Sequence, residues 1–271
     1  MRIWKLIAVL LIFVWQQSAA ADEIEVDVQL VLAVDVSRSM SANELEIQRR
    51  GYAEALASPE VADAIRKGLL GRIAVTYVEW AGVYSQRTIV DWTLISSGAD
   101  AAAFAAKLTA RFDPALRRTS ISGVLDEMAK RFDGNGYTSN RRIIDVSGDG
   151  PNNQGRPVLE ARADVLAKGI VINGLPLMTK EGLGARWHLD DLDDYYRHCV
   201  IGGPAAFVIP VLEWSQFPAA VRQKLILELA GRTPPERARV WRTSDGAGSK
   251  SYDCLIGEKI WQRFIDTYDL P

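Results

Sequence analysis

Short apolar segments alternate with segments of helical periodicity along most of this chain. The first apolar segment, residues 26–34, is rich in Val, Leu and Ala, and similar segments occupy residues 73–80, 143–146, 170–172 and 207–211. Nearly continuous apolar runs of this length are typical of strands that are buried on both faces of a sheet. Strands that alternate with helices favour right-handed βαβ units. The pattern therefore predicts an α/β fold with a doubly wound, Rossmann-like and mostly parallel sheet.

Helices are expected between these strands, at residues 45–56, 104–112, 121–132, 158–166 and 221–229. In the third of them, apolar side chains recur at steps of three and four residues, which places them on one helix face. Ser41 and Glu44 form a capping-box pattern at the start of the first helix. Residues 84–92 follow the strand at 73–80 after Ala81-Gly82, so we expect them to form one antiparallel strand at the edge of the sheet.

The mature chain is expected to be one domain. The 271 residues of the full sequence suffice for one large α/β domain, and no Pro- or Gly-rich linker divides them. We expect this domain at residues 22–230, with an insertion at 177–204 that is longer than a usual connection. Residues 231–271 form a C-terminal extension, in which the amphipathic segment 256–268 is expected to pack back onto the domain.

The first 21 residues have the pattern of a secretory signal peptide. Arg2 and Lys5 precede the apolar run 6–15, and Ala19-Ala20-Ala21 precedes Asp22. The alternative is an uncleaved membrane anchor, but the run is only about half of the roughly 20 residues that span a bilayer. We therefore expect cleavage after Ala21 and a periplasmic or secreted protein without stable membrane insertion.

Cysteine content and charge give two further expectations. Cys199 and Cys254 both lie in the exported part, where a pair of cysteines is more often bridged than free. Two separate buried thiols are the alternative. The net charge is only −2 at neutral pH, so no electrostatic feature of the whole chain favours binding to nucleic acid or to an anionic membrane.

Five oxygen-bearing side chains follow the predicted strands in three segments. Asp35, Ser37 and Ser39 follow the first strand, Thr119 precedes the helix at 121–132, and Asp149 follows the strand at 143–146. The carboxyl ends of parallel strands meet at one edge of a doubly wound sheet, and ligands bind there. Carboxylate and hydroxyl oxygens without His or Cys suit a hard cation such as Mg²⁺.

These residues resemble the metal-ion-dependent adhesion site (MIDAS) of von Willebrand factor A (vWA) domains. The match comprises Asp35-x-Ser37-x-Ser39, the later Thr119 and the still later Asp149-Gly150, with none of the five positions substituted. Further segments resemble an exported bacterial branch of this superfamily whose function is unknown. These segments are 78–82, 144–153, 173–176 and 199–204.

The resemblance implies a vWA-type fold and one divalent ion, Mg²⁺ or in its place Mn²⁺ or Ca²⁺. The two serines and the threonine would be hydroxyl ligands, and the two aspartates would bind directly or through water. An open coordination position would accept an Asp or Glu of an unidentified partner protein. The resemblance thus implies an adhesion or assembly module and no catalytic residues.

Three other interpretations of these residues are weaker. Ser39 or Ser41 alone could be a helix cap, but capping does not explain five oxygen residues in three segments. Residues 150–157 approach a phosphate-binding loop, yet Arg156 stands where the motif needs Lys and Pro157 where it needs a hydroxyl. The main alternative function is a metal-dependent hydrolase of the cell envelope. Against it, both histidines, His188 and His198, lie in the insertion, and no Gly-x-Ser-x-Gly motif occurs.

One further aspartate, Asp145, lies inside the strand at 143–146. We expect it to be a buried partner of Arg141 or Arg142 rather than a sixth metal ligand.

Overall fold

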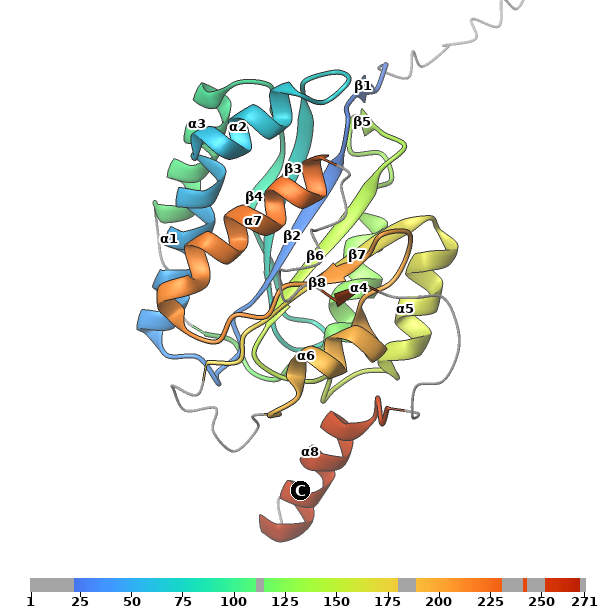
Figure 1. The fold of residues 1–271 in the computed structure, drawn as a ribbon. Helices are drawn as coiled ribbons and strands as arrows, with labels where there is room; N and C mark the ends of the chain where they lie inside the picture. The colour runs from blue at the N-terminus through green and yellow to red at the C-terminus, as the bar shows by residue number, and fades with distance from the viewer. Residues whose placement is uncertain (1–21, 111–114, 180–188, 231–240, 243–251, 269–271) are drawn as a thin grey trace, which may run out of the picture.

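A seven-stranded sheet with the order β4-β3-β2-β6-β7-β8-β9 forms the centre of the molecule (Figure 1). The computed structural model describes residues 22–110, 115–179, 189–230, 241–242 and 252–268. The strands of this sheet are β2 (Gln29–Asp35), β3 (Ile73–Trp80), β4 (Gln86–Ile95), β6 (Arg142–Gly148), β7 (Ile170–Pro176), β8 (Phe207–Val208) and β9 (Trp241–Arg242). Strands β2, β3, β6, β7 and β8 are parallel, whereas β4 is antiparallel to β3. The predicted fold class and its antiparallel edge strand are confirmed, and the short β9 adds a second antiparallel pairing, with β8.

Helices cover both faces of this sheet. They are α1 (Ala42–Leu56), α2 (Pro59–Arg66), α3 (Gly98–Thr109), α4 (Ile121–Lys130), α5 (Val158–Ala167), α6 (Leu192–Tyr195), α7 (Phe217–Ala230) and α8 (Ile256–Tyr268). Helices α1, α2, α3 and α7 lie on one face, and α4 and α5 lie on the other (Figure 1). A small parallel pair, β1 (Ile24–Glu25) with β5 (Tyr137–Thr138), lies beside the main sheet. None of the helices in the described ranges is long and apolar enough to cross a membrane.

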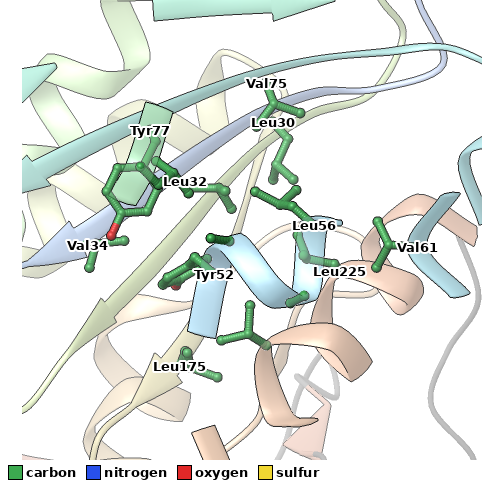
Figure 2. Close-up of a cluster of buried hydrophobic side chains, with 14 of the residues drawn as sticks. Leu30, Leu32, Val34, Tyr52, Leu56, Val61, Val75, Tyr77, Leu175 and Leu225 are labelled. Atoms are coloured by element: carbon green, nitrogen blue, oxygen red, sulfur yellow. The ribbon is translucent and has the colours of Figure 1, made fainter. Parts of the chain in front are cut away.

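The alternation of side chains along β2 divides the core into two layers. Leu30, Leu32 and Val34 pack on the face of α1 and α7, whereas Val31 and Ala33 pack on the face of α4. All of β2 is buried, as expected for a central strand of a parallel sheet. Figure 2 shows the first of these layers, in which residues of β2 and β3 face residues of α1, α2 and α7.

Local capping signals set the starts of several helices. Ser41 Oγ accepts a hydrogen bond from Glu44 N, and Glu44 accepts one from Ser41 N, so the predicted capping box is confirmed. Helix α2, whose N-cap is Ser58 and whose first residue is Pro59, is an additional helix that was not predicted from the sequence. Strand β8 ends at Val208, earlier than expected, although Ile209 and Val211 still donate backbone hydrogen bonds to Gly174 and Pro176 of β7.

The predicted insertion contains α6 and a π-helical turn, Tyr196–Val200, both of which pack into the core layer of α4 and α5. The predicted disulfide between Cys199 and Cys254 is confirmed. It joins this turn to the segment before α8, and α8 then extends from the end of the sheet where the parallel strands finish (Figure 1). The predicted signal peptide, residues 1–21, and residues 180–188, 231–240 and 243–251 lie outside the described residues.

The position of β2 defines where a ligand can bind. Strand β2 lies between β3 and β6, so the sheet grows in opposite directions on its two sides. The carboxyl ends of β2 and β6 therefore meet at a topological switch point, which is the usual ligand site of such sheets.

Candidate metal centre

Asp35 is the last residue of β2 and is fully buried. Its Oδ1 atom accepts a hydrogen bond of 2.7 Å from the backbone N–H of Ser37. Its carbonyl oxygen accepts a hydrogen bond of 3.2 Å from Gln48 Nε2 on α1. The loop that follows β2 is thus held to the end of the strand by its own side chain and by the first helix.

A chain of hydroxyl contacts connects this loop to β6. Ser37 Oγ and Ser39 Oγ are 2.8 Å apart, and Ser39 Oγ donates a hydrogen bond of 2.9 Å to Asp149 Oδ1. Because Ser39 donates its only proton to Asp149, Ser37 is the donor in the contact between the two serines. The structure therefore brings together four of the five predicted residues: Asp35, Ser37, Ser39 and Asp149.

The second oxygen of the Asp35 carboxylate has no partner. Oδ2 is buried and accepts no hydrogen bond in the described part of the chain. A Cβ atom added to Gly148 would lie 3.0 Å from this oxygen and 2.9 Å from the hydroxyl of Tyr196, which is also buried and unpaired. Only glycine at position 148 lets β6 pass so close to these two polar atoms.

Thr119 reaches the same region through backbone contacts. Its N–H donates to Asn153 Oδ1 over 3.0 Å, and its carbonyl oxygen accepts from Asn153 N over 2.9 Å. Leu116 lies three residues before Thr119. It donates its N–H to Val36 O over 2.8 Å and forms an isolated parallel bridge with Ser37. Thr119 is 6% exposed, and its hydroxyl makes no hydrogen bond within the residues that the structure describes. The third segment is therefore attached to both of the others.

Two residues near the site were not predicted from the sequence. Asn153 connects the Thr119 segment to the loop after Asp149, and the polar run that follows Asp149 was a signal that could have suggested it. Tyr196 comes from the π-helical turn of the insertion, and no local pattern links it to Gly148.

The two carboxylates disfavour each other's ionisation. The pKa of Asp35 is raised well above its ordinary value, first by burial and then by the charge of Asp149. Burial also raises the pKa of Asp149 to about 6, although Ser39 stabilises its charged form by donating a hydrogen bond. No Lys, Arg or His of the described chain forms an ion pair with either carboxylate. Buried carboxylates without a cationic partner must take up protons or a cation.

This donor set fits a hard divalent cation. The unpaired Asp35 Oδ2 is a buried acceptor that lacks a positive partner, and the loop that follows Asp35 carries the oxygens of Ser37 and Ser39, which are connected to Asp149. In the described ranges, no group of three or more His, Cys, Asp or Glu side chains could hold a metal ion. A site here would therefore depend on hydroxyl oxygens in addition to two aspartates, which suits Mg²⁺ better than a transition metal.

The residues that suggest a phosphate-binding loop or a hydrolase make contacts of a different kind. Arg156, in the segment that approaches a phosphate-binding loop, forms ion pairs with Asp126 and Asp164. His198 lies on the π-helical turn, where its ring stacks on Tyr252 with centroids 5.4 Å apart. His188 lies outside the described residues.

The prediction that Asp145 pairs with Arg141 or Arg142 is wrong. Asp145 Oδ1 lies 2.6 Å from Nζ of Lys224, which comes from α7 on the neighbouring core layer. Lys224 also pairs with Glu228, one turn later on the same helix. Arg141 instead donates to the carbonyl oxygens of α7, and Arg142 to that of Lys168. Ile144 and Val146 face the layer of α4 and α5, so Asp145 between them points to the opposite face of the sheet, where α7 carries Lys224.

A family model described as "Protein of unknown function (DUF1194)" matches residues 25–233 of this chain. No curated protein matches it significantly. Among solved structures, proximal thread matrix protein 1 from the mussel byssus, with a zinc occupied MIDAS motif, is 14% identical with a TM-score of 0.55. That alignment covers 78% of this chain and 50% of the other.

Two bacterial structures are similar to the same extent. The pilus adhesin SpaC of Lactobacillus rhamnosus GG is 13% identical with a TM-score of 0.54, over 75% of this chain and 30% of that one. A von Willebrand factor type A structure from Catenulispora acidiphila is 13% identical with a TM-score of 0.52, over 75% and 43%. This chain thus spans half or less of each of these three structures. At such identities the likeness shows the fold alone, which is of the vWA type.

Proposed function

This chain belongs to the DUF1194 family of proteins of unknown function, and from that premise we propose that it is an exported, metal-dependent protein-interaction module. One divalent ion binds at Asp35, Ser37, Ser39, Thr119 and Asp149, and an Asp or Glu of a partner protein completes its coordination. The module serves in adhesion or assembly and is not a catalyst.

The observation that carries this proposal is the unpaired Oδ2 of Asp35. It is buried beside a second carboxylate, and no described cation compensates the two charges. A bound Mg²⁺ supplies positive charge and accepts further oxygen ligands in water-accessible positions. Asp149 keeps partial exposure and Ser39 lies at the loop surface, so an incoming carboxylate can approach from the solvent.

Titration calorimetry with Mg²⁺ and Mn²⁺ tests the metal site directly. Wild type should bind one ion with modest affinity, and Asp35→Ala and Asp149→Ala should bind none while remaining folded, because the site lies at the end of the sheet. Asp133→Ala is the matched control, since Asp133 is exposed and follows the far end of α4. If wild type binds neither ion, or if the two site variants bind as well as wild type, these residues form only a turn and a helix cap.

Activity assays on the same protein distinguish a binding module from a hydrolase. Wild type with Mg²⁺ should show no turnover of esterase, phosphatase or protease substrates. Turnover that disappears in Asp35→Ala would instead support the metal-dependent hydrolase.

The proposed export rests on the signal-peptide pattern and on the disulfide. Cys199 and Cys254 are bridged, as is usual in oxidising compartments. N-terminal sequencing of material from the envelope fraction should find Asp22 as the first residue. A chain that retains residues 1–21 in the membrane pellet would contradict export as a mature, periplasmic or secreted protein.

A further inference from the structure

Three arginines lie around the candidate metal centre, and each is adjacent in sequence to a predicted ligand. Arg38 lies between Ser37 and Ser39, and Arg117 and Arg118 directly precede Thr119. All three are exposed. We call Arg38, Arg117 and Arg118 the basic rim.

The fold brings these residues together from two separate segments. Leu116 pairs with Ser37 in a parallel bridge, with its N–H donating to Val36 O over 2.8 Å. Arg38 and Arg117 directly follow the two residues of this isolated bridge, so both arginines leave it from one point beside the site. Arg38 and Arg117 form no ion pair within the described part of the chain.

The third member of the rim is held in a defined position. Arg118 has a φ of 73°, in the left-handed region that residues other than glycine rarely adopt. Its guanidinium lies 3.6 Å from the centre of the Trp261 ring on α8. The first turn of α8 is itself attached to the site loop, because Asn152 Nδ2 donates to Glu258 Oε1 over 2.7 Å.

The turn that carries Arg117 and Arg118 is packed closely against the hairpin before β4. A Cβ atom at Gly82 would lie 3.0 Å from Arg117 O and 3.3 Å from Arg118 Cβ. This packing holds Arg117 and Arg118, two adjacent exposed arginines, on one turn beside the site.

The charge balance of the site gives this rim a function. Two ionised aspartates neutralise a divalent ion, so the metal with its protein ligands has no net charge to attract an acidic partner. The chain as a whole has a net charge of −2, which does not attract one either. The rim supplies the missing positive potential at the mouth of the site.

From this arrangement we infer that the partner is an acidic protein segment with several carboxylates close in sequence. One carboxylate completes the metal coordination, and its neighbours pair with the basic rim. This inference rests on the proposed function and specifies the partner of the same site.

Two nine-residue peptides are suitable probes, one with three aspartates and one in which two of them are asparagine. Fluorescence anisotropy with the mature protein and Mg²⁺ measures their binding at low and high salt. The three-aspartate peptide should bind about tenfold more tightly, because its two additional carboxylates pair with the basic rim and each exposed charge pair contributes only modestly. High salt should reduce this difference.

Removal of the rim charges should abolish the preference without affecting the metal. Arg38→Gln/Arg117→Gln should bind both peptides alike and should bind Mg²⁺ as wild type does in calorimetry. Arg66→Gln/Lys67→Gln removes two exposed charges at the opposite end of the sheet and should retain the preference.

The outcomes separate this inference from the proposed function. If Mg²⁺ binds but the two peptides bind with equal affinity, or neither peptide binds, the rim inference is wrong while the metal site stands. If the three-aspartate peptide binds through Arg38 and Arg117 even in chelator, the rim inference holds and the metal-dependent function does not. If dextran sulfate binds through Arg38 and neither peptide does, the surface recognises another polyanion and the inference is wrong.

Discussion

The hydroxyl of Ser39 donates a hydrogen bond of 2.9 Å to Oδ1 of Asp149 and so joins the loop after β2 to the loop after β6. Ser39 in turn contacts Ser37 over 2.8 Å. A single side chain therefore connects the ends of two adjacent parallel strands.

The metal-free protein should lose stability as the pH rises. Burial raises the pKa of Asp149 to about 6, above its value in the unfolded chain. Protonated Asp149 therefore favours the folded state at about pH 4, and this contribution disappears as the pH rises through about 6. The loss should be at most about 3 kcal/mol, because the partial exposure of Asp149 screens the effect. Asp35, whose pKa is also raised, changes stability in the same direction.

Urea unfolding in chelator across this pH range measures the effect. Asp149→Asn should flatten the pH dependence, and Mg²⁺ added to wild type should reverse the loss near neutral pH by binding only the folded state. A wild-type stability that is independent of pH would contradict the unpaired state of these carboxylates.

Gly148→Ala should disrupt the site, whereas Gly150→Ala should not. A Cβ atom at Gly148 would meet the hydroxyl of Tyr196 and the carboxylate of Asp35 at 2.9 Å and 3.0 Å, but one at Gly150 meets nothing within 4 Å. We expect Gly148→Ala to cost about 1–3 kcal/mol by overpacking and to weaken Mg²⁺ binding. Thermal unfolding and calorimetry on the two variants provide the comparison. Equal behaviour would mean that β6 can move away from Asp35 at little cost.

Lys224→Met should be strongly destabilising. Lys224 compensates both Asp145 and Glu228 in the interior, and burial raises the pKa of Asp145 to about 7 even with Lys224 beside it. Removing one partner of a buried ion pair typically costs about 3–5 kcal/mol, since the remaining charge is unpaired. Lys168→Met is the control, because Lys168 is exposed after α5. Urea unfolding curves that coincide for the two variants would show that the network contributes little.

Removal of the disulfide should release α8 before it unfolds the domain. Cys199 and Cys254 are separated by 55 residues, and a loop of that length stabilises a fold by about 4 kcal/mol in the chain-entropy model. In Cys199→Ala/Cys254→Ala, amide exchange should accelerate first at residues 252–268, which otherwise contact the loop at Asn152. The core strands β2 and β6 should keep their protection. Uniformly faster exchange would instead indicate that the bridge stabilises the whole domain.

The order of strands and helices could be predicted from the sequence because burial leaves a local pattern. The apolar run of β2 indicates a strand covered on both faces, and the capping box of Ser41 and Glu44 indicates where α1 begins. The aspartates and serines of the candidate site follow predicted strands, and the geometry of a parallel sheet brings strand ends together. Pairing of the two cysteines followed from their number and from the expected compartment.

Only the tertiary structure decided which residues from distant segments meet. It pairs Asp145 with Lys224 rather than with the nearby arginines, brings Tyr196 to Gly148, and joins Leu116 to Ser37 at the site. Periodicity records that a side chain is buried, but it does not record its partner. The partner depends on how helices and loops pack across the sheet, and the energies that select one packing come from many contacts that are distant in sequence.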